Sequence, residues 1–310
     1  MAGRKITVVG AGNVGATTAH LAAIENLADI VLIDIVEGLA QGKALDLAEA
    51  SPLSGYDVSI TGTTDWKVAE QSDIVIITSG LPRKPGMSRD DLLAKNVGIV
   101  KSVTSQIVKY CPNSFIIVVC NPLDAMVYTA SKVSSLEKRK VMGMAGELDC
   151  ARFSYFISTE LNISNRDIKP MLMGGHGDDM VPLPRLTTIK DKPLTSLLSE
   201  EKIEALIDRT RNGGIEIVNL LGSSAYYAPA AGAVKMAKAI LEDSQSTVCC
   251  CAYCDKEYSA GGYYVGVPAI LGANGIEKIV MLDLNDAERA AFTKSLSHVK
   301  QLAAKVDSLL

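Results

Sequence analysis

Apolar, β-branched runs alternate with segments of helical character throughout the first half of the 310-residue chain. These runs predict strands at residues 5–12, 29–34, 57–62, 73–80, 115–122 and 141–144. Their apolar residues are continuous, which is expected when helices cover both faces of a sheet. Repeated strand–helix–strand units make the strands parallel. The sequence therefore predicts an α/β fold with an N-terminal Rossmann doubly wound parallel sheet.

The second half of the chain is organised differently. Helices are predicted at residues 146–161, near 200–220, at 229–242 and from about 285 to the end. Residues 171–189 and 248–275 favour strands and turns instead. A chain of 310 residues is also long for one hydrophobic core. We therefore expect a Rossmann domain over residues 1–145 and a C-terminal mixed α+β substrate domain over residues 146–310.

Composition limits the environment and the partners of the protein. The net charge is −4 and no block of like charges stands out, which argues against a broad nucleic-acid surface. A predicted strand begins almost at once after MAGRK, so we expect no targeting peptide. No apolar run reaches the roughly 18 residues of a membrane span. Seven cysteines without a disulfide-framework spacing favour a reducing cytoplasm.

The segment VCCCAYC holds four of the seven cysteines, namely Cys249, Cys250, Cys251 and Cys254. This segment could be a metal site or an apolar strand. A structural zinc site usually uses two separated ligand pairs. The chain has no second C-x-x-C pair, and its three histidines are scattered. We therefore predict no metal, and a strand that uses cysteine as a small apolar residue and is sensitive to oxidation.

The segment GAGNVG follows the first predicted strand and opens a helix, which is the context of a dinucleotide site. Its glycines allow a tight turn and let the backbone approach a pyrophosphate at the helix N-terminus. Asp34 ends the next strand, where a carboxylate accepts hydrogen bonds from both ribose hydroxyls and repels a 2′-phosphate. The pattern favours NAD over NADP, with FAD or a purely structural turn as weaker alternatives. The predicted NAD contacts are Gly10, Gly12, Asn13, Val14, Gly15, Asp34, Gly80, Asn96 and Asn121.

A candidate reacting group lies in GGHGDD, where glycines flank His176 and leave room for a ligand. Histidine is suited to proton transfer near neutral pH, although a lone histidine is more often structural. Asp149 and Arg152 lie three residues apart on a predicted helix, and so on one face. They could form an ordinary solvated ion pair. Alternatively, Asp149 orients His176 while Arg152 binds a substrate carboxylate. Asn121 ends a predicted strand and is either a turn residue or a substrate contact.

The loop LPRKPGMSRDD follows another buried strand and carries three cations, Arg83, Lys84 and Arg89. Loops at the carboxyl ends of parallel strands bind ligands in open α/β sheets. The cations therefore indicate an anionic ligand. Lys84 lies between an arginine and a proline and is expected to be solvated.

These motifs resemble, nearly end to end and in the same order, those of the lactate/malate dehydrogenase family: GAGNVGATTA, Asp34, GLPRKPGMSRDDL, VVCNPLD, GELDCARF, GGHGDDMVPLPR and YVGVPAILGANGIEKI. Within that family they are most similar to the bacterial malate dehydrogenases with a lactate-dehydrogenase-like fold. The resemblance implies an NAD-dependent enzyme of the tricarboxylic acid cycle that interconverts malate and oxaloacetate. It also implies a homodimer or homotetramer.

The resemblance implies roles for individual residues. His176, paired with Asp149, would move the hydroxyl proton of malate while the C2 hydride goes to NAD. Arg152 would bind the C1 carboxylate. The other implied substrate contacts are Asn121, near the nicotinamide, and Ser224, on the pocket floor.

Two arginines of the loop are expected to set the substrate. By the resemblance, Arg89 polarises the carbonyl, where negative charge develops. By the same resemblance, Arg83 would neutralise a second carboxylate. Family members that reduce pyruvate have a glutamine at the corresponding position. An unpaired buried charge costs roughly 3–5 kcal/mol, which is roughly a 10²–10⁴-fold preference. The predicted substrates are therefore dicarboxylates.

Glu147 departs from the family, which usually has an apolar residue at this position; it either perturbs the local field or points to solvent. Three other functions remain as alternatives. An NAD-sensing protein without catalytic activity would need only the glycines and Asp34. A lactate dehydrogenase would differ at Arg83. An NAD-dependent glycosidase on a related fold is not supported, because the sequence has no cysteine–histidine pairing typical of metal ligands.

Overall fold

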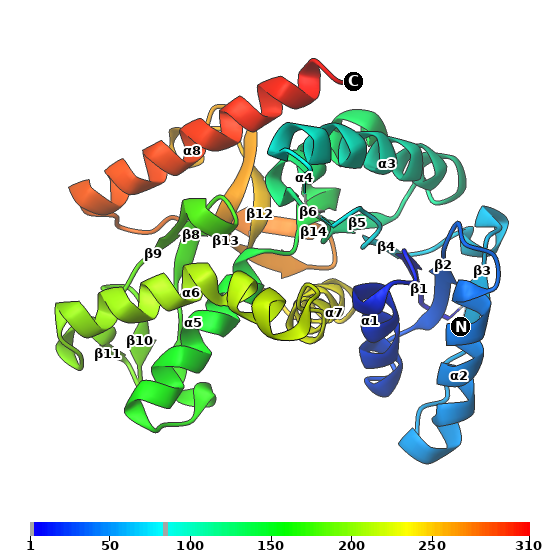
Figure 1. Cartoon of the computed structure of the whole chain (residues 1–310), viewed down its shortest axis with the longest axis horizontal. Helices are drawn as coiled ribbons and strands as arrows, with labels where there is room; N and C mark the ends of the chain where they lie inside the picture. The colour runs from blue at the N-terminus through cyan, green and yellow to red at the C-terminus, as the bar shows by residue number, and fades with distance from the viewer. Residues whose placement is uncertain (1–2, 83–85) are drawn as a thin grey trace.

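A nine-stranded sheet runs through the protein (Figure 1). The computed structural model describes residues 3–82 and 86–310. Six strands of the sheet are parallel and stand in the order β6-β5-β4-β1-β2-β3. That order is the Rossmann arrangement, so the predicted fold is confirmed. The strands are β1 (Lys5–Val9), β2 (Asp29–Ile33), β3 (Ile60–Thr63), β4 (Ile74–Ile77), β5 (Phe115–Val118) and β6 (Val141–Gly143).

Helices cover both faces of the parallel sheet, which explains the continuous apolar runs. In β4, Ile74 and Ile76 belong to one buried cluster, and Val75 and Ile77 belong to the other. The first cluster includes residues of α1 (Asn13–Ile24) and α7 (Tyr227–Leu241). The second is formed with α3 (Arg89–Tyr110) and α4 (Leu123–Ser134), and α2 (Leu39–Ser54) packs against β3. Successive strand residues point to opposite faces, so both faces require apolar side chains.

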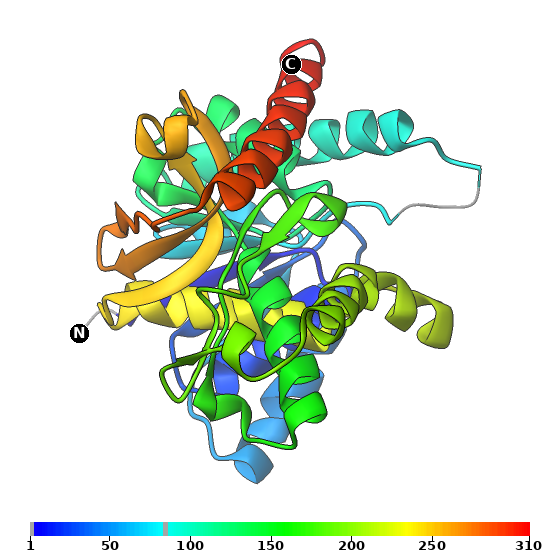
Figure 2. The ribbon, with the colours of Figure 1, turned by 90° about the vertical axis from the view of Figure 1, so that its left-hand side faces the viewer.

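The second half extends this sheet, because β12 (Ser246–Cys254) joins β6 in antiparallel orientation through Cys251 and Gly143. β13 (Tyr263–Gly272) and β14 (Gly275–Ile279) complete it. α5 (Gly146–Leu161), α6 (Glu200–Leu221) and α8 (Asp286–Asp307) lie where helices were predicted (Figure 2). Smaller sheets contain β8 (Leu172–Gly174) with β9 (Met180–Pro182), and β7 (Ile168–Lys169) with β10 (Thr188–Ile189) and β11 (Lys192–Pro193). Single 3-10 turns span Trp66–Ala69, Lys138–Lys140, Asn165–Asp167, Gly177–Asp179, Leu194–Ser196 and Glu257–Ser259.

Several strand limits differ from the prediction. β1 ends at Val9, because Gly10 has a φ of +103° and turns the chain away from the sheet. β3 begins only at Ile60, three residues after the predicted start. β14 was not predicted, since its sequence GIEKI is short and contains two adjacent charged residues on an edge strand.

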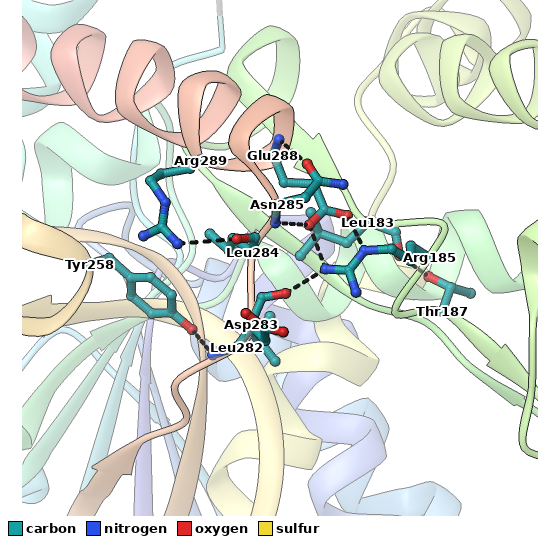
Figure 3. Close-up of polar contacts among 10 residues, drawn as sticks. All are labelled: Leu183, Arg185, Thr187, Tyr258, Leu282, Asp283, Leu284, Asn285, Glu288 and Arg289. Atoms are coloured by element: carbon teal, nitrogen blue, oxygen red, sulfur yellow. Dashed lines mark hydrogen bonds and ion pairs between the residues drawn. The ribbon is translucent and has the colours of Figure 1, made fainter.

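The start of α8 is fixed to the segment that follows β9 (Figure 3). Arg185 donates hydrogen bonds from Nε and Nη2 to the carboxylate of Glu288, at 3.2 and 2.8 Å, and also to the Asp283 carbonyl. Glu288 completes a capping box with Asn285, with both hydrogen bonds at 2.9 Å. The hydrogen bond from Arg185 is the largest cause that lowers the pKa of Glu288. These contacts hold the helix that packs on the His176 loop.

Within residues 3–82 and 86–310, no helix is both long and apolar enough to cross a membrane.

Replacing Glu288 with alanine is expected to lower the free energy of unfolding by about 1 kcal/mol, the usual effect of a lost helix cap. The pKa of this carboxyl is lowered by folding, so its stabilisation is present above the unfolded value of 4.5 and is lost as pH falls through the folded value. Urea denaturation at neutral and acidic pH measures both effects. Glu204→Ala, on an exposed position of α6, is the control and should show neither.

Candidate active site

The loops after β1, β4 and β5 meet at one edge of the sheet, where the strand order switches direction between β1 and β4. Thr78 Oγ1 donates hydrogen bonds of 3.0 Å to the carbonyls of Val9 and Gly10. This joins the loop after β4 to the glycine turn. A crevice outside the carboxyl ends of the strands at such a point is where open α/β sheets bind ligands.

The three glycines of GAGNVG differ in what requires them. Gly10 has a positive φ, and a Cβ at Gly15 would lie 1.8 Å from the Gly10 carbonyl oxygen, so the fold itself requires both. A Cβ at Gly12 would meet nothing within 4 Å, and its φ of −69° suits any residue. Gly12 begins α1 without a side-chain cap among the described residues. The open space at this helix N-terminus fits the pyrophosphate of a dinucleotide.

Asp34 is fixed beside the glycine turn. Its Oδ2 accepts a hydrogen bond from the Ala11 backbone N–H at 2.6 Å, and its Oδ1 accepts one from Val36 N–H at 2.9 Å. A carboxylate has about four acceptor positions, so positions remain for two hydroxyl donors. The residues present therefore fit the ribose and pyrophosphate of NAD. The other predicted contacts in this turn, Asn13 and Val14, form the first turn of α1.

Asn96, a predicted NAD contact, connects two loops through its side chain. Its side chain is fully buried, and its amide bonds the Leu81 backbone N–H at 2.8 Å and carbonyl at 3.1 Å. It also donates to the Asn121 carbonyl at 2.6 Å. Asn96 thus ties together the two loops that carry the predicted ligand contacts, next to exposed Gly80.

His176, Asp149 and Arg152 are brought together as predicted. His176 Nδ1 lies 2.8 Å from Asp149 Oδ2, and Arg152 Nη1 lies 3.8 Å from Asp149 Oδ1. The side chains of Asp149 and Arg152 are only 4% and 14% exposed, so this is not a solvated surface pair. No described residue hydrogen-bonds to His176 Nε2. Asp149 therefore fixes one ring nitrogen, and the other is left without a hydrogen bond to a described residue.

Burial and the charge of Asp149 have opposing effects on the pKa values of His176 and Arg152. Burial disfavours the imidazolium, but the charge and hydrogen bond of Asp149 outweigh it and raise the pKa of His176 above its ordinary value. Burial lowers the pKa of Arg152, and the charge of Asp149 opposes this. The guanidinium lies against Gly213 of α6, where a Cβ would be 3.3 Å from Arg152 Cδ. Glycine at that position leaves space for the arginine.

Asp124 was not predicted as a residue of the site, although the motif VVCNPLD contains it. Its Oδ2 accepts the backbone N–H of His176 at 3.1 Å, and its Oδ1 lies 3.3 Å from the Cys251 thiol. The signal that could have found it is a carboxylate in the first helical turn after a strand-to-helix junction.

The remaining predicted substrate contacts lie on three other segments of the chain. Arg89 is the first residue of α3, and its Nη2 is 3.5 Å from Asp178 Oδ2, with both side chains more than 80% exposed. Ser224 lies in the exposed turn between α6 and α7. Asn121 precedes α4. Arg83 and Lys84 lie outside the described residues.

The side chain of Glu147 points neither to the His176–Asp149 pair nor to open solvent. Its carboxylate pairs with Lys235 of α7 and accepts the Cys249 backbone N–H at 3.1 Å, and its side chain is 11% exposed. The departure from the family pattern therefore connects α5 to α7 and β12. All seven cysteines are buried and free, and no described group of three or more His, Cys, Asp or Glu side chains could hold a metal ion.

Comparisons with known proteins agree with this geometry over the whole chain. Residues 4–143 match the NAD binding domain of lactate/malate dehydrogenases, and residues 146–309 match their alpha/beta C-terminal domain. The malate dehydrogenase of Rhodopirellula baltica is 53% identical over 309 residues, with 99% of this chain and 98% of the relative covered. Two solved structures are similarly close.

One is the apo malate dehydrogenase of Picrophilus torridus, with a TM-score of 0.97, 45% identity, and coverage of 99% of this chain and 98% of that chain. The other is the lactate dehydrogenase of Cryptosporidium parvum with lactic acid and NAD, with a TM-score of 0.96, 41% identity and 99% coverage of both chains. The overall fold therefore does not separate the two activities, and individual side chains must.

Replacing Gly12 with alanine is expected to leave the fold unchanged and to weaken NAD binding roughly tenfold or more, because the added methyl group occupies ligand space. Calorimetric titration with NADH measures the affinity. Gly98→Ala is the matched control, since its Cβ on exposed α3 also meets nothing within 4 Å. Equal NADH affinity in both variants would contradict the assignment of Gly12.

Proposed function

The chain belongs to the lactate/malate dehydrogenase family, and we propose that it is an NAD-dependent malate dehydrogenase that interconverts (S)-malate and oxaloacetate. The observation that carries this proposal is the buried group of His176, Asp149 and Arg152 beside a dinucleotide crevice. Full-length relatives at about 50% identity that are named malate dehydrogenase support it.

We propose that His176 is the proton-transfer residue. Neutral His176 accepts the hydroxyl proton of malate at Nε2, and the protonated ring returns it to the carbonyl oxygen in the reverse direction. Asp149 fixes the ring and stabilises its charged form through the 2.8 Å contact. NAD, when bound, accepts the hydride from C2 of malate.

The cations around the crevice divide the remaining work. Arg152 binds the C1 carboxylate with its planar guanidinium. Arg89 stabilises the negative charge that develops on the substrate oxygen, for which it must leave its exposed contact with Asp178. Arg83 pairs with the second carboxylate. Asn121 and Ser224 complete the substrate contacts.

We further propose a domain boundary after residue 145, where β6 ends and α5 begins, a cytoplasmic location, and a homodimer or homotetramer. The seven free cysteines support a reducing compartment. Exposed apolar side chains support the oligomer: Ile24, Leu45, Tyr155 and Ile215. Light scattering coupled to size-exclusion chromatography tests it, and a monomer at micromolar concentration would exclude it.

Titration of His176 is expected to control the rate. Because its pKa is raised above 6.5, malate oxidation should fall as pH drops through the raised value, and oxaloacetate reduction should fall as pH rises through it. Profiles of kcat/KM in both directions measure this. His176→Asn cannot titrate and should lose roughly 10²–10⁴-fold in rate. A variant that retained the parental rate would exclude His176 as the proton-transfer residue.

Substrate choice tests the proposed activity most simply, by following NADH absorbance with oxaloacetate or pyruvate. The parent protein should oxidise NADH rapidly with oxaloacetate and slowly with pyruvate. Arg83→Gln should lower the oxaloacetate rate and raise the pyruvate rate, because the second carboxylate loses its partner. Lys84→Gln removes the neighbouring cation and should leave selectivity unchanged. A parent that prefers pyruvate would instead be a lactate dehydrogenase.

A further inference from the structure

We propose that Asp124 is a positioning residue for His176, and that Cys251 fixes the Asp124 carboxylate by donating its thiol proton. The proposal rests on the proposed function, because it assigns a role to groups behind the proton-transfer histidine. It also gives a function to one cysteine of the VCCCAYC strand.

Asp124 lies where it can hold the His176 loop. It is in the first turn of α4 and only 7% exposed, and its Oδ2 accepts the His176 backbone N–H at 3.1 Å. The loop is closely packed there, since a Cβ at Gly175 would lie 3.3 Å from the same oxygen. The hydroxyl of Ser295 on α8 accepts the preceding backbone N–H, that of Gly175, at 2.8 Å. The loop backbone is therefore bonded from both sides, by α4 and by α8.

Cys251 provides the second partner of this buried carboxylate. Its thiol lies 3.3 Å from Asp124 Oδ1, and burial raises the pKa of that thiol well above its ordinary value. The thiol therefore stays protonated and donates. A buried carboxylate oxygen without a donor is costly, so this contact stabilises the ionised side chain. Cys250, the preceding residue, points to the opposite face of β12 and packs in the other apolar cluster.

The space around Cys251 selects a small side chain. It pairs with Gly143 on β6 and Gly266 on β13, and a Cβ at Gly143 would lie 3.0 Å from Cys251 Cβ. Serine fits the same space and can donate a hydrogen bond, whereas alanine cannot. This pair of substitutions separates hydrogen bonding from packing.

The charged groups that face His176 come from α4 and α5. Asp149 contacts the ring, and Asp124 contacts the backbone; both negative charges favour the imidazolium, whereas Arg152 disfavours it. Asp178 and Asp179 follow in the same loop, where Asp178 pairs with Arg89 and Asp179 with His298 of α8. Of the two carboxylates that favour the imidazolium, Asp124 is the one whose partner is a cysteine.

The test uses NMR titration of the imidazole rings of the full-length protein. The chain has only three histidines, so His20 and His298 serve as internal controls, and His176→Asn assigns the third signal. Asp124→Asn keeps an oxygen for the His176 N–H but removes the charge. It should lower the His176 titration midpoint by roughly one unit, the lower end for an opposite charge a few ångströms away. The malate-oxidation limb of kcat/KM should shift equally.

Cys251→Ala should lower the midpoint in the same direction by a smaller amount, and Cys251→Ser should restore it. Cys250→Ala removes the same atoms on the other face and should leave the midpoint and the pH profile unchanged.

Two results would overturn the proposal. One is a folded Asp124→Asn or Cys251→Ala protein whose His176 midpoint and pH profile match the parent. The other is an equal shift in Cys250→Ala. Loss of the proposed function would look different: the parent protein would then lack malate oxidation altogether, while the NMR titration would still report on Asp124.

Discussion

The hydrogen bond between His176 and Asp149 is the interaction on which the site depends. It joins the loop after β8 to α5, and it determines which ring nitrogen faces the crevice. The same helix places Arg152 beside Asp149, three residues later. A single helical turn thus positions the partner of the histidine ring and the cation that we propose binds a carboxylate. A small rotation of α5 would disturb both.

The sheet explains how cofactor and proton-transfer groups come together. The glycine turn, the loop after β4 and Asn121 follow three neighbouring parallel strands, so they share one edge. β12 and β13 then continue the same sheet instead of forming a separate one, and they place Cys251 and Gly266 under the His176 loop. The second half is therefore built on the first. Glu147, paired with Lys235, adds a further contact between α5 and α7.

The sequence was sufficient to predict those parts of the candidate site that depend on a local residue pattern. The glycine turn, Asp34 and the spacing of Asp149 and Arg152 could be predicted, because each follows from one strand end or one helix turn. Tertiary contacts could not. The hydrogen bonds by which Asn96 connects two loops were not predicted, and its contact with the cofactor stays a prediction. The direction of Glu147 and the partnership of Asp124 with Cys251 depend on residues about 90 to 130 positions away, which no spacing rule reports.

The central claim is that His176 Nε2 faces the substrate while Asp149 holds Nδ1 and Arg152 holds a carboxylate. A crystal structure with NADH and hydroxymalonate, a short 2-hydroxy dicarboxylate, tests it most directly. We predict that the hydroxyl oxygen lies within hydrogen-bond distance of Nε2, with one carboxylate on Arg152. A dicarboxylate bound elsewhere, or a His176 ring turned away from Asp149 in the complex, would contradict the account.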